Sequence, residues 1–229
     1  MRNLSQDKKG VILLSGGLDS VTTFYLAKHQ GYKLSALIFY YGQRHKREIN
    51  CAIKIAELKG VDYRLVRLSI PWVESSLTKK NISVPLNRDT NSKDLPSTYV
   101  SGRNIIFLSY AASLAESINA RYIFIGAHTE DYSGYPDCRK EFLEEMEKAI
   151  NLGISKKIKI LYPLIDKSKR DIVELGKKLD VPFEYTWSCY LGGKIPCQKC
   201  DRCRCRIRAC QELGLIDPLL QRKKILSKK

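Results

Sequence analysis

The sequence has no apolar run that approaches the roughly 20 residues of a membrane-spanning helix. Residues 1–10 are polar and charged and lack the apolar core of a secretory signal, so we expect a cytoplasmic protein with no membrane partner. Two common nucleotide-binding patterns, G-x-x-x-x-G-K-S/T and G-x-G-x-x-G, are also missing, which excludes a P-loop and the usual dinucleotide fingerprint. Internal repeats and low-complexity segments are absent as well.

Acidic residues are scarce relative to basic ones. The 229 residues include 40 Lys and Arg but only 24 Asp and Glu, which gives a formal net charge of +16. Half of this excess lies in residues 189–229, where 11 basic residues oppose 3 acidic ones, a difference of +8. Such a basic end suggests nucleic acid as a partner. A solvated tail beside a site for anionic substrates also explains it, and we favour this second interpretation.

Short apolar runs alternate with segments of helical periodicity. Strands are expected at 10–15, 33–40, 62–68, 121–127 and 157–162, the last at an edge. Helices are expected at 19–30, 44–59, 102–120, 139–150 and 168–180. This order predicts an α/β fold, an open parallel sheet covered by helices on both faces. The segment 102–120 is apolar on most sides and is expected to be the central buried helix.

The chain is expected to divide into an α/β domain, 1–185, and a C-terminal zinc-binding module with a basic tail, 186–229. Residues 70–100 interrupt the alternation with three prolines and many Ser, Asn and Asp residues. A loop of this length is usually functional, so we expect a lid or a partner-contact segment, with a disordered excursion as the alternative. Ligands of such folds bind beyond the carboxyl ends of the strands, where we expect residues 15–20, 40–45, 102–104 and 128–139.

The six residues Ser15-Gly-Gly-Leu-Asp-Ser20 join the first expected strand to the first helix. Adjacent glycines open backbone conformations closed to other residues, and the amides of such a turn form an anion site with the start of the helix. Asp19 would repel a phosphate, so we expect it either to bind Mg²⁺ or to act as an acid at the helix N-terminus. An ordinary capped turn is the alternative.

This turn resembles the S-G-G-x-D-S loop of the ATP pyrophosphatases. Members of that superfamily split ATP between the α and β phosphates, hold the pyrophosphate in this loop and transfer AMP to a substrate oxygen. The resemblance implies that ATP is bound by Leu14, Ser15, Gly16, Gly17, Leu18, Asp19 and Ser20.

Five of the eight cysteines lie between positions 189 and 205, a clustering that indicates a metal site rather than disulfides. Three of them have the spacing C-x₂-C-x₂-C, and we expect the metal ligands to be Cys189, Cys197, Cys200 and Cys203. Four thiolates suit one structural Zn²⁺, and an iron–sulfur cluster is the alternative. Cys205 competes as the fourth ligand but would crowd Cys203. Cys138 is either a nucleophile or a structural residue, and we favour the structural role.

Several segments together resemble the 7-cyano-7-deazaguanine synthase family, over about residues 9–218. They are 15–20, Y-G-Q-R-H at 41–45, G-R-N at 102–104, S-G-Y-P-D-C-R at 133–139, T-W-S-C at 186–189 and the cysteine spacing. The resemblance implies a homodimeric, ATP-dependent ligase that uses Mg²⁺. It converts 7-carboxy-7-deazaguanine and ammonia to 7-cyano-7-deazaguanine (preQ0), a precursor of queuosine or archaeosine. One ATP adenylates the carboxylate, ammonia displaces AMP, and a second ATP activates the amide oxygen.

Roles for individual residues follow from the same resemblance. Catalytic positions are expected at Asp19, Arg103 and Lys167, where Arg103 pairs with phosphate or carboxylate and Lys167 reaches a phosphate. Contacts with the substrate are expected from Gln43, Arg44, His45, Asp131, Tyr135, Asp137 and Arg139. A surface position for His45 and a salt bridge for Arg103 are the plainer alternatives.

Three other functions remain open. A tRNA-modifying ATP pyrophosphatase, such as a thiolation enzyme, would explain the charge and the cysteines but needs reactive cysteines. A zinc-containing nucleic-acid binder would leave the loop at 15–20 without a purpose. A related enzyme could use another acceptor for the same chemistry. The additional Cys205 and the Lys-rich end at 223–229 depart from the family pattern and leave room for a further partner.

Overall fold

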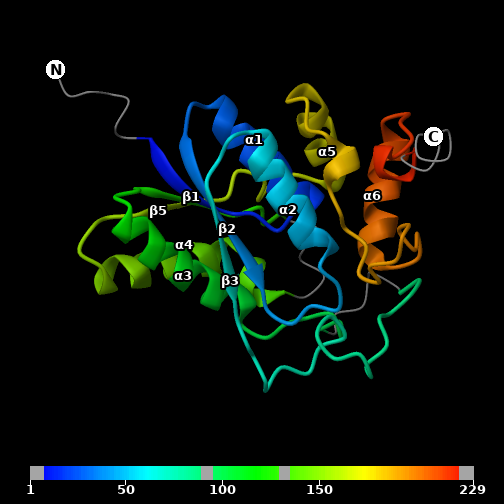
Figure 1. Cartoon of the computed structure of the whole chain (residues 1–229), viewed down its shortest axis with the longest axis horizontal. Coiled ribbons are helices and arrows are strands. Elements are labelled where there is room, and N and C mark those ends of the chain that lie inside the picture. The colour runs from blue at the N-terminus through cyan, green and yellow to red at the C-terminus, as the bar shows by residue number, and fades with distance from the viewer. Residues whose placement is uncertain (1–7, 89–94, 129–134, 222–229) are drawn as a thin grey trace.

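The computed structural model describes residues 8–88, 95–128 and 135–221. Five strands form one sheet in the order β3-β2-β1-β4-β5, and every neighbouring pair is parallel (Figure 1). The strands are β1 (Lys9–Leu13), β2 (Lys33–Tyr40), β3 (Tyr63–Arg67), β4 (Tyr122–Phe124) and β5 (Lys159–Leu161). The predicted parallel α/β fold is confirmed, and β5 lies at an edge as expected.

Helices cover both faces of this sheet (Figure 1). They are α1 (Leu18–His29), α2 (Arg47–Leu58), α3 (Arg103–Ser117), α4 (Lys140–Gly153), α5 (Lys169–Lys178) and α6 (Asp201–Glu212). Two short 3-10 helices, η2 (Pro136–Cys138) and η3 (Phe183–Tyr185), precede α4 and follow α5. None of the helices in the described ranges is both long and apolar enough to cross a membrane.

Alternating side chains of β1 show why the strands are apolar throughout. Val11 and Leu13 pack into the core beneath α3 and α4. Ile12 and Leu14 pack into the core on the opposite face, beneath α1, α2, α5 and α6. A strand that is buried on both faces needs apolar residues at successive positions, as the sequence has here.

The prediction for the helix at 102–120 is wrong in one respect, because α3 is not buried on all sides. Its buried stripe consists mainly of Leu108 and small alanines such as Ala111 and Ala115. Two large apolar side chains point away from this stripe, with Ile105 47% and Tyr110 44% exposed. An apolar composition all around a helix therefore does not prove that the helix is central.

The order of the strands places a switch point between β1 and β4. The chain moves outward from β1 through β2 to β3 on one side, and through β4 to β5 on the other. Loops leaving β1 and β4 at their carboxyl ends therefore separate there and leave a crevice, the usual ligand site of this architecture.

Helix α6 shares a core with the helices of the α/β layer. Ala209 and Cys210 of α6 belong to the same buried cluster as Phe24 of α1 and Ile172 of α5. The proposed division of the chain at residue 185 remains a prediction.

Candidate active site and cysteine cluster

A large cleft opens at the carboxyl end of the sheet and encloses about 1260 Å³, including the solvent at its mouth. Its walls come from the loop after β1, the end of β2, the first turns of α2 and α3, the end of β4, residues 187–190 and α6. Each segment that we expected near the strand ends contributes residues to these walls, at 15–20, 41–45, 103–104 and 135–138.

The loop at 15–20 is held in shape by its own serines. The hydroxyls of Ser15 and Ser20 lie 2.9 Å apart, and the Ser20 hydroxyl also lies 3.1 Å from the Gly17 carbonyl, to which it can donate. Gly16 has a φ of +81°, and a Cβ there would lie 2.1 Å from the Glu48 carbonyl oxygen. Only glycine lets α2 approach the loop so closely. The predicted loop therefore exists as an ordered turn on the cleft wall.

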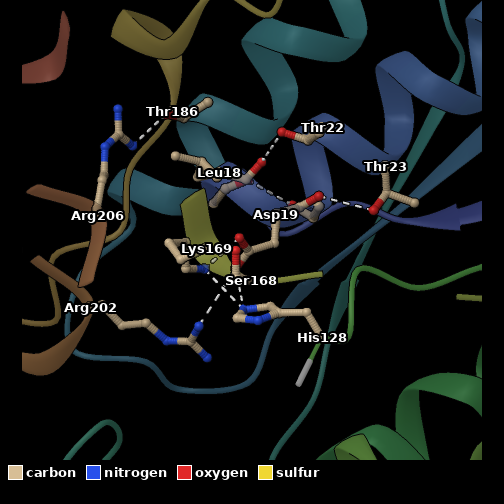
Figure 2. Close-up of polar contacts among 12 residues, drawn as sticks. Leu18, Asp19, Thr22, Thr23, His128, Ser168, Lys169, Thr186, Arg202 and Arg206 are labelled. Carbon is tan, nitrogen blue, oxygen red and sulfur yellow. Dashed lines mark hydrogen bonds and ion pairs between the residues drawn. The ribbon is translucent and has the colours of Figure 1, made fainter. Parts of the chain in front are cut away.

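Basic side chains from three distant segments surround Asp19 (Figure 2). The Lys169 ammonium of α5 donates to Asp19 Oδ1 at 2.6 Å. On the other carboxylate oxygen, His128 Nε2 lies at 3.4 Å and Arg202 Nη1 of α6 at 3.6 Å. Burial alone would raise the pKa of the Asp19 carboxyl, but Lys169, His128 and Arg202 together hold it well below its usual range. Asp19 is therefore ionised and faces the cleft.

Lys169, two residues beyond the predicted Lys167, is the lysine that reaches this site. The Lys169 side chain is only 6% exposed, and its ammonium also lies 3.0 Å from His128 Nε2. Ser168 caps α5 through a reciprocal capping box with Asp171, which places Lys169 at the first helical position. Neither Lys169 nor the half-buried Lys167 is among the residues that line the cleft, and the contact of Lys167 with a phosphate stays a prediction.

Arg103, at the start of α3, lines the cleft as expected. Its Nη1 donates to the Tyr41 hydroxyl at 3.3 Å, and its guanidinium lies 5.8 Å from the centre of the Tyr41 ring. Tyr135 also lines the cleft; its hydroxyl lies 2.8 Å from Thr98 Oγ1 in a hydrogen bond. A guanidinium and a phenol therefore stand on the cleft wall.

Residues 43–45 line the cleft, but their polar side-chain groups form hydrogen bonds to other parts of the protein. The Gln43 amide accepts from the Tyr41 N–H and donates to the Phe39 carbonyl. Arg44 donates to the carbonyl groups of Lys79, Lys80 and Ile82, and so fastens part of the segment 70–100 beside the cleft. His45 Nε2 lies 3.0 Å from the Cys189 carbonyl.

Two further residues predicted to bind substrate, Asp137 and Arg139, are not among those that line the cleft. The Asp137 carboxylate accepts from the Asn104 N–H at 2.9 Å, so it binds the first turn of α3. Arg139 is exposed and precedes α4. Asp131 lies outside the described residues. Cys138 is buried at the cleft wall, with the Asn104 amide 3.3 Å from its sulfur.

Two charged residues of the cleft escaped the sequence analysis, Glu48 and Arg202. Burial raises the pKa of the Glu48 carboxyl to about 7, although the guanidinium groups of Arg103 and Arg202 lower it. Glu48 comes three residues after the expected segment 40–45, so the spacing on α2 was the signal that could have revealed it. No comparable signal marks Arg202, which lies among the cysteines.

The sulfur atoms of Cys189, Cys197, Cys200 and Cys203 all lie within 4.8 Å of one another. Those of Cys197 and Cys203 are 3.9 Å apart, close to the separation of about 3.8 Å that a tetrahedral site with metal–sulfur bonds of about 2.3 Å requires. Backbone N–H groups of Lys199 and Cys200 donate to the Cys197 sulfur. These four residues can hold a metal ion, and Cys205 lies outside the group.

Trp187 connects this cysteine cluster to the loop at 15–20. Its backbone N–H donates to the Gly16 carbonyl at 2.9 Å, and its indole N–H donates to the Cys189 carbonyl at 2.8 Å. The cluster therefore borders the cleft.

Comparison with known proteins identifies the family. A family model described as queuosine biosynthesis protein QueC matches residues 9–214. The 7-cyano-7-deazaguanine synthase of Clostridium kluyveri is 50% identical over 220 residues, which cover 93% of this chain and 97% of that protein. That of Trichodesmium erythraeum is 47% identical over 221 residues, which cover 93% and 100%.

Among solved structures, NMN synthetase from Francisella tularensis aligns over 97% of this chain and 78% of its own, at a TM-score of 0.50 and 19% identity. This likeness shows a shared fold only. Because the family model and the relatives extend over nearly the whole sequence and include the loop, the cleft and the cysteine cluster, the chain belongs to the QueC family of queuosine biosynthesis proteins.

Proposed function

We propose that the chain converts 7-carboxy-7-deazaguanine and ammonia to 7-cyano-7-deazaguanine (preQ0) at the expense of ATP. The observation that carries this proposal is the full-length similarity to proteins of that name, at 50% identity in one case. The ordered loop at 15–20, on the wall of the cleft at the carboxyl end of the sheet, supports it.

The chemistry requires activation of oxygen twice. A carboxylate is a poor electrophile, and its oxygen is a poor leaving group. Attack of a carboxylate oxygen on the α-phosphorus of ATP forms a carbon–oxygen–phosphorus link and releases pyrophosphate. Ammonia then forms the carbon–nitrogen bond and AMP leaves with the oxygen. The amide oxygen attacks a second ATP in the same way, and loss of AMP and both amide protons leaves the nitrile. This places the protein among the ATP-dependent ligases that form C–N bonds.

The loop supplies the phosphate site in this proposal. The backbone of Gly17 and the hydroxyls of Ser15 and Ser20 stand at the start of α1, where N–H groups and the helix dipole favour an anion. Asp19, which is ionised, would hold the Mg²⁺ that neutralises phosphate oxygens. Arg103 would bind the substrate carboxylate by its planar fork.

Zinc is the metal that we propose for the four cysteines. Four sulfur ligands close the tetrahedral shell and leave no open coordination position, so the role of the ion is structural. A cytoplasmic homodimer is part of the same proposal. A tRNA-thiolating enzyme would need reactive cysteines, but four of the described cysteines form the proposed metal site and Cys138 is buried beside Asn104. Of the others, Cys210 is buried, and Cys51 and Cys205 are half-buried.

The first test is a turnover assay with ATP, 7-carboxy-7-deazaguanine and ammonium, in which AMP, ADP and the nitrile are measured by mass. We expect AMP and nitrile from the wild type, and neither from Asp19→Ala. Asp19→Asn preserves the shape of the side chain and tests the charge alone. ATP turnover without nitrile would assign another acceptor, and absence of ATP turnover in the folded, metal-loaded protein would contradict the proposal.

A further inference from the structure

Arg202 joins the cysteine cluster to the phosphate loop. It lies in the first turn of α6, between the metal-ligand positions Cys200 and Cys203. Its side chain extends from this turn toward the cleft, where Figure 2 shows it directed at Asp19. Nε donates to the Tyr190 hydroxyl at 3.1 Å, and Nη1 lies 3.6 Å from Asp19 Oδ2. The side chain is 24% exposed, so a ligand in the cleft can reach it.

The contact between Arg202 and Asp19 is a charge contact rather than a hydrogen bond. Its length of 3.6 Å exceeds the usual range of about 2.7–3.2 Å for an N–H···O hydrogen bond. The same carboxylate already accepts from Lys169 at 2.6 Å on its other oxygen. Arg202 is therefore the weaker of the two cationic partners, and it is the one that lines the cleft.

Charges of both signs meet at this end of the cleft. Lys169 pairs with Asp19 at 2.6 Å, and the guanidinium groups of Arg103 and Arg202 both act on the Glu48 carboxyl. Arg202 also lies beside Asp19 in the first turn of α1, where the helix dipole favours an anion. An anion beside the loop at 15–20 would meet both the backbone amides and this guanidinium.

We propose that Arg202 binds the phosphoryl oxygens of the pyrophosphate part of ATP in the loop at 15–20, and that the cysteine cluster positions it there. This inference rests on the proposed function. On binding, the guanidinium exchanges its long contact with Asp19 for a bidentate contact with phosphate, for which its fork is well suited.

The cysteine cluster fixes the orientation of the Arg202 turn. Cys200 precedes α6 as its N-cap residue, and Cys203 is in its first turn, so both sulfurs anchor the same turn of helix. The turn cannot rotate without displacing one of the two sulfurs from the cluster. The four-cysteine site next to the cleft therefore does more than stabilise the fold, because it positions the Arg202 guanidinium at the phosphate site.

The test is calorimetric titration of magnesium pyrophosphate into the metal-loaded protein, its Arg202→Gln variant and an Arg208→Gln control. Arg208 lies on the same helix but is 63% exposed and pairs with Glu212 at 3.7 Å. We expect Arg202→Gln to weaken pyrophosphate binding by roughly tenfold to a hundredfold, the range for hydrogen bonds to charged groups. Arg208→Gln should bind as the wild type does. Metal content and melting temperature should be unchanged in both variants.

Pyrophosphate affinity that is the same in folded, metal-loaded Arg202→Gln and wild type would overturn the inference. If the variant lost its metal or its fold, chemical modification of the wild type would decide. Magnesium pyrophosphate should protect Arg202, but not Arg208, from an arginine-selective dicarbonyl, as read by peptide mass spectrometry. Equal modification of Arg202 with and without pyrophosphate would overturn it. A wild type that does not bind pyrophosphate would contradict the ATP chemistry itself, and this inference with it.

Discussion

Glu48 shows how a single side chain can link the cleft to pH. Its carboxyl is raised to a pKa of about 7 by burial, above the ordinary value of 4.5. Between these two values the folded protein binds a proton that the unfolded chain has released. The free energy of unfolding must therefore fall as the pH rises through this window, because ionisation of a desolvated carboxyl is unfavourable in the folded state.

Glu48→Gln should remove this part of the pH dependence. We expect the unfolding free energy of the wild type to decrease between about pH 5 and pH 7 relative to that of the variant. Urea titrations at several pH values in the absence of ligands measure it. Glu57→Gln on the same helix is the control, because Glu57 is exposed. Parallel stability curves for the wild type and Glu48→Gln would show that the Glu48 carboxyl titrates outside this range.

Asp19 and Lys169 form an ion pair in which each residue's contribution to the free energy of unfolding depends on the other. Both side chains are largely buried, at 17% and 6% exposed. We expect Asp19→Asn to destabilise the protein by about 3 kcal/mol, because it leaves a buried ammonium without its carboxylate. Adding Lys169→Met should restore part of the loss, so the two changes should deviate from additivity by about 1–3 kcal/mol.

Urea denaturation of the two single variants and the double variant measures this coupling. The exposed pair Glu174 and Lys178, 2.9 Å apart on the same helix as Lys169, is the matched control. The corresponding changes Glu174→Gln and Lys178→Met should be additive within about 0.5 kcal/mol. Equal coupling energies for the two pairs would show that burial does not strengthen the Asp19–Lys169 pair.

Helix α6 is fixed at its first turn and at its middle by different interactions. Cys200 and Cys203 of the cysteine cluster stand at the first turn. At the middle of the helix, the almost fully buried Arg206 forms a two-pronged ion pair with Asp217 at 2.7 and 2.8 Å. Arg206 also donates to the Thr186 hydroxyl and the Phe183 carbonyl. These bonds attach residues 183–186 to α6. The cysteine cluster then holds the irregular stretch 187–200, which connects residues 183–186 to the helix.

Removal of the metal should loosen this stretch. We expect a chelator to lower the melting temperature and to expose residues 187–203 to proteolysis, because binding energy at such sites is folding energy. Calorimetry and elemental analysis before and after treatment measure both effects. Cys205→Ser should retain the metal, whereas Cys200→Ser should lose it, since only Cys200 belongs to the cluster. Loss of metal from Cys205→Ser would revise the ligand set.

The net charge of the molecule bears on its partners. The formal charge of +16 suffices for weak attraction to any polyanion, whereas we propose that the cationic groups at the cleft serve a phosphate-bearing small molecule. We expect tRNA to bind weakly, with an affinity that falls steeply as salt rises, and to leave the rate of nitrile formation unchanged. Filter binding over a salt series and turnover with added tRNA measure this. Stimulation of ATP turnover by tRNA would favour the rival RNA-modifying activity.

Much of the architecture was predictable because it follows from local pattern. Apolar strands alternating with amphipathic segments require a parallel sheet with two covered faces, and S-G-G-L-D-S between strand and helix requires a tight turn with exposed amides. The four cysteine ligands followed from their spacing. Local pattern failed for α3, since a helix with apolar residues on most sides does not reveal which side a sheet will cover.

The sequence by itself determined the fold class, the family, the turn at 15–20 and the cluster of four cysteines, because each rests on short motifs whose residues are near one another in the chain. Only the tertiary structure decided that Lys169 meets Asp19, that Asp137 binds a helix end, and that Arg202 enters the cleft. These partners are 150, 33 and 183 residues apart in sequence, as the numbering shows. Charge pairing over such separations depends on how helices stack on the sheet, and no periodicity or spacing in the chain encodes it.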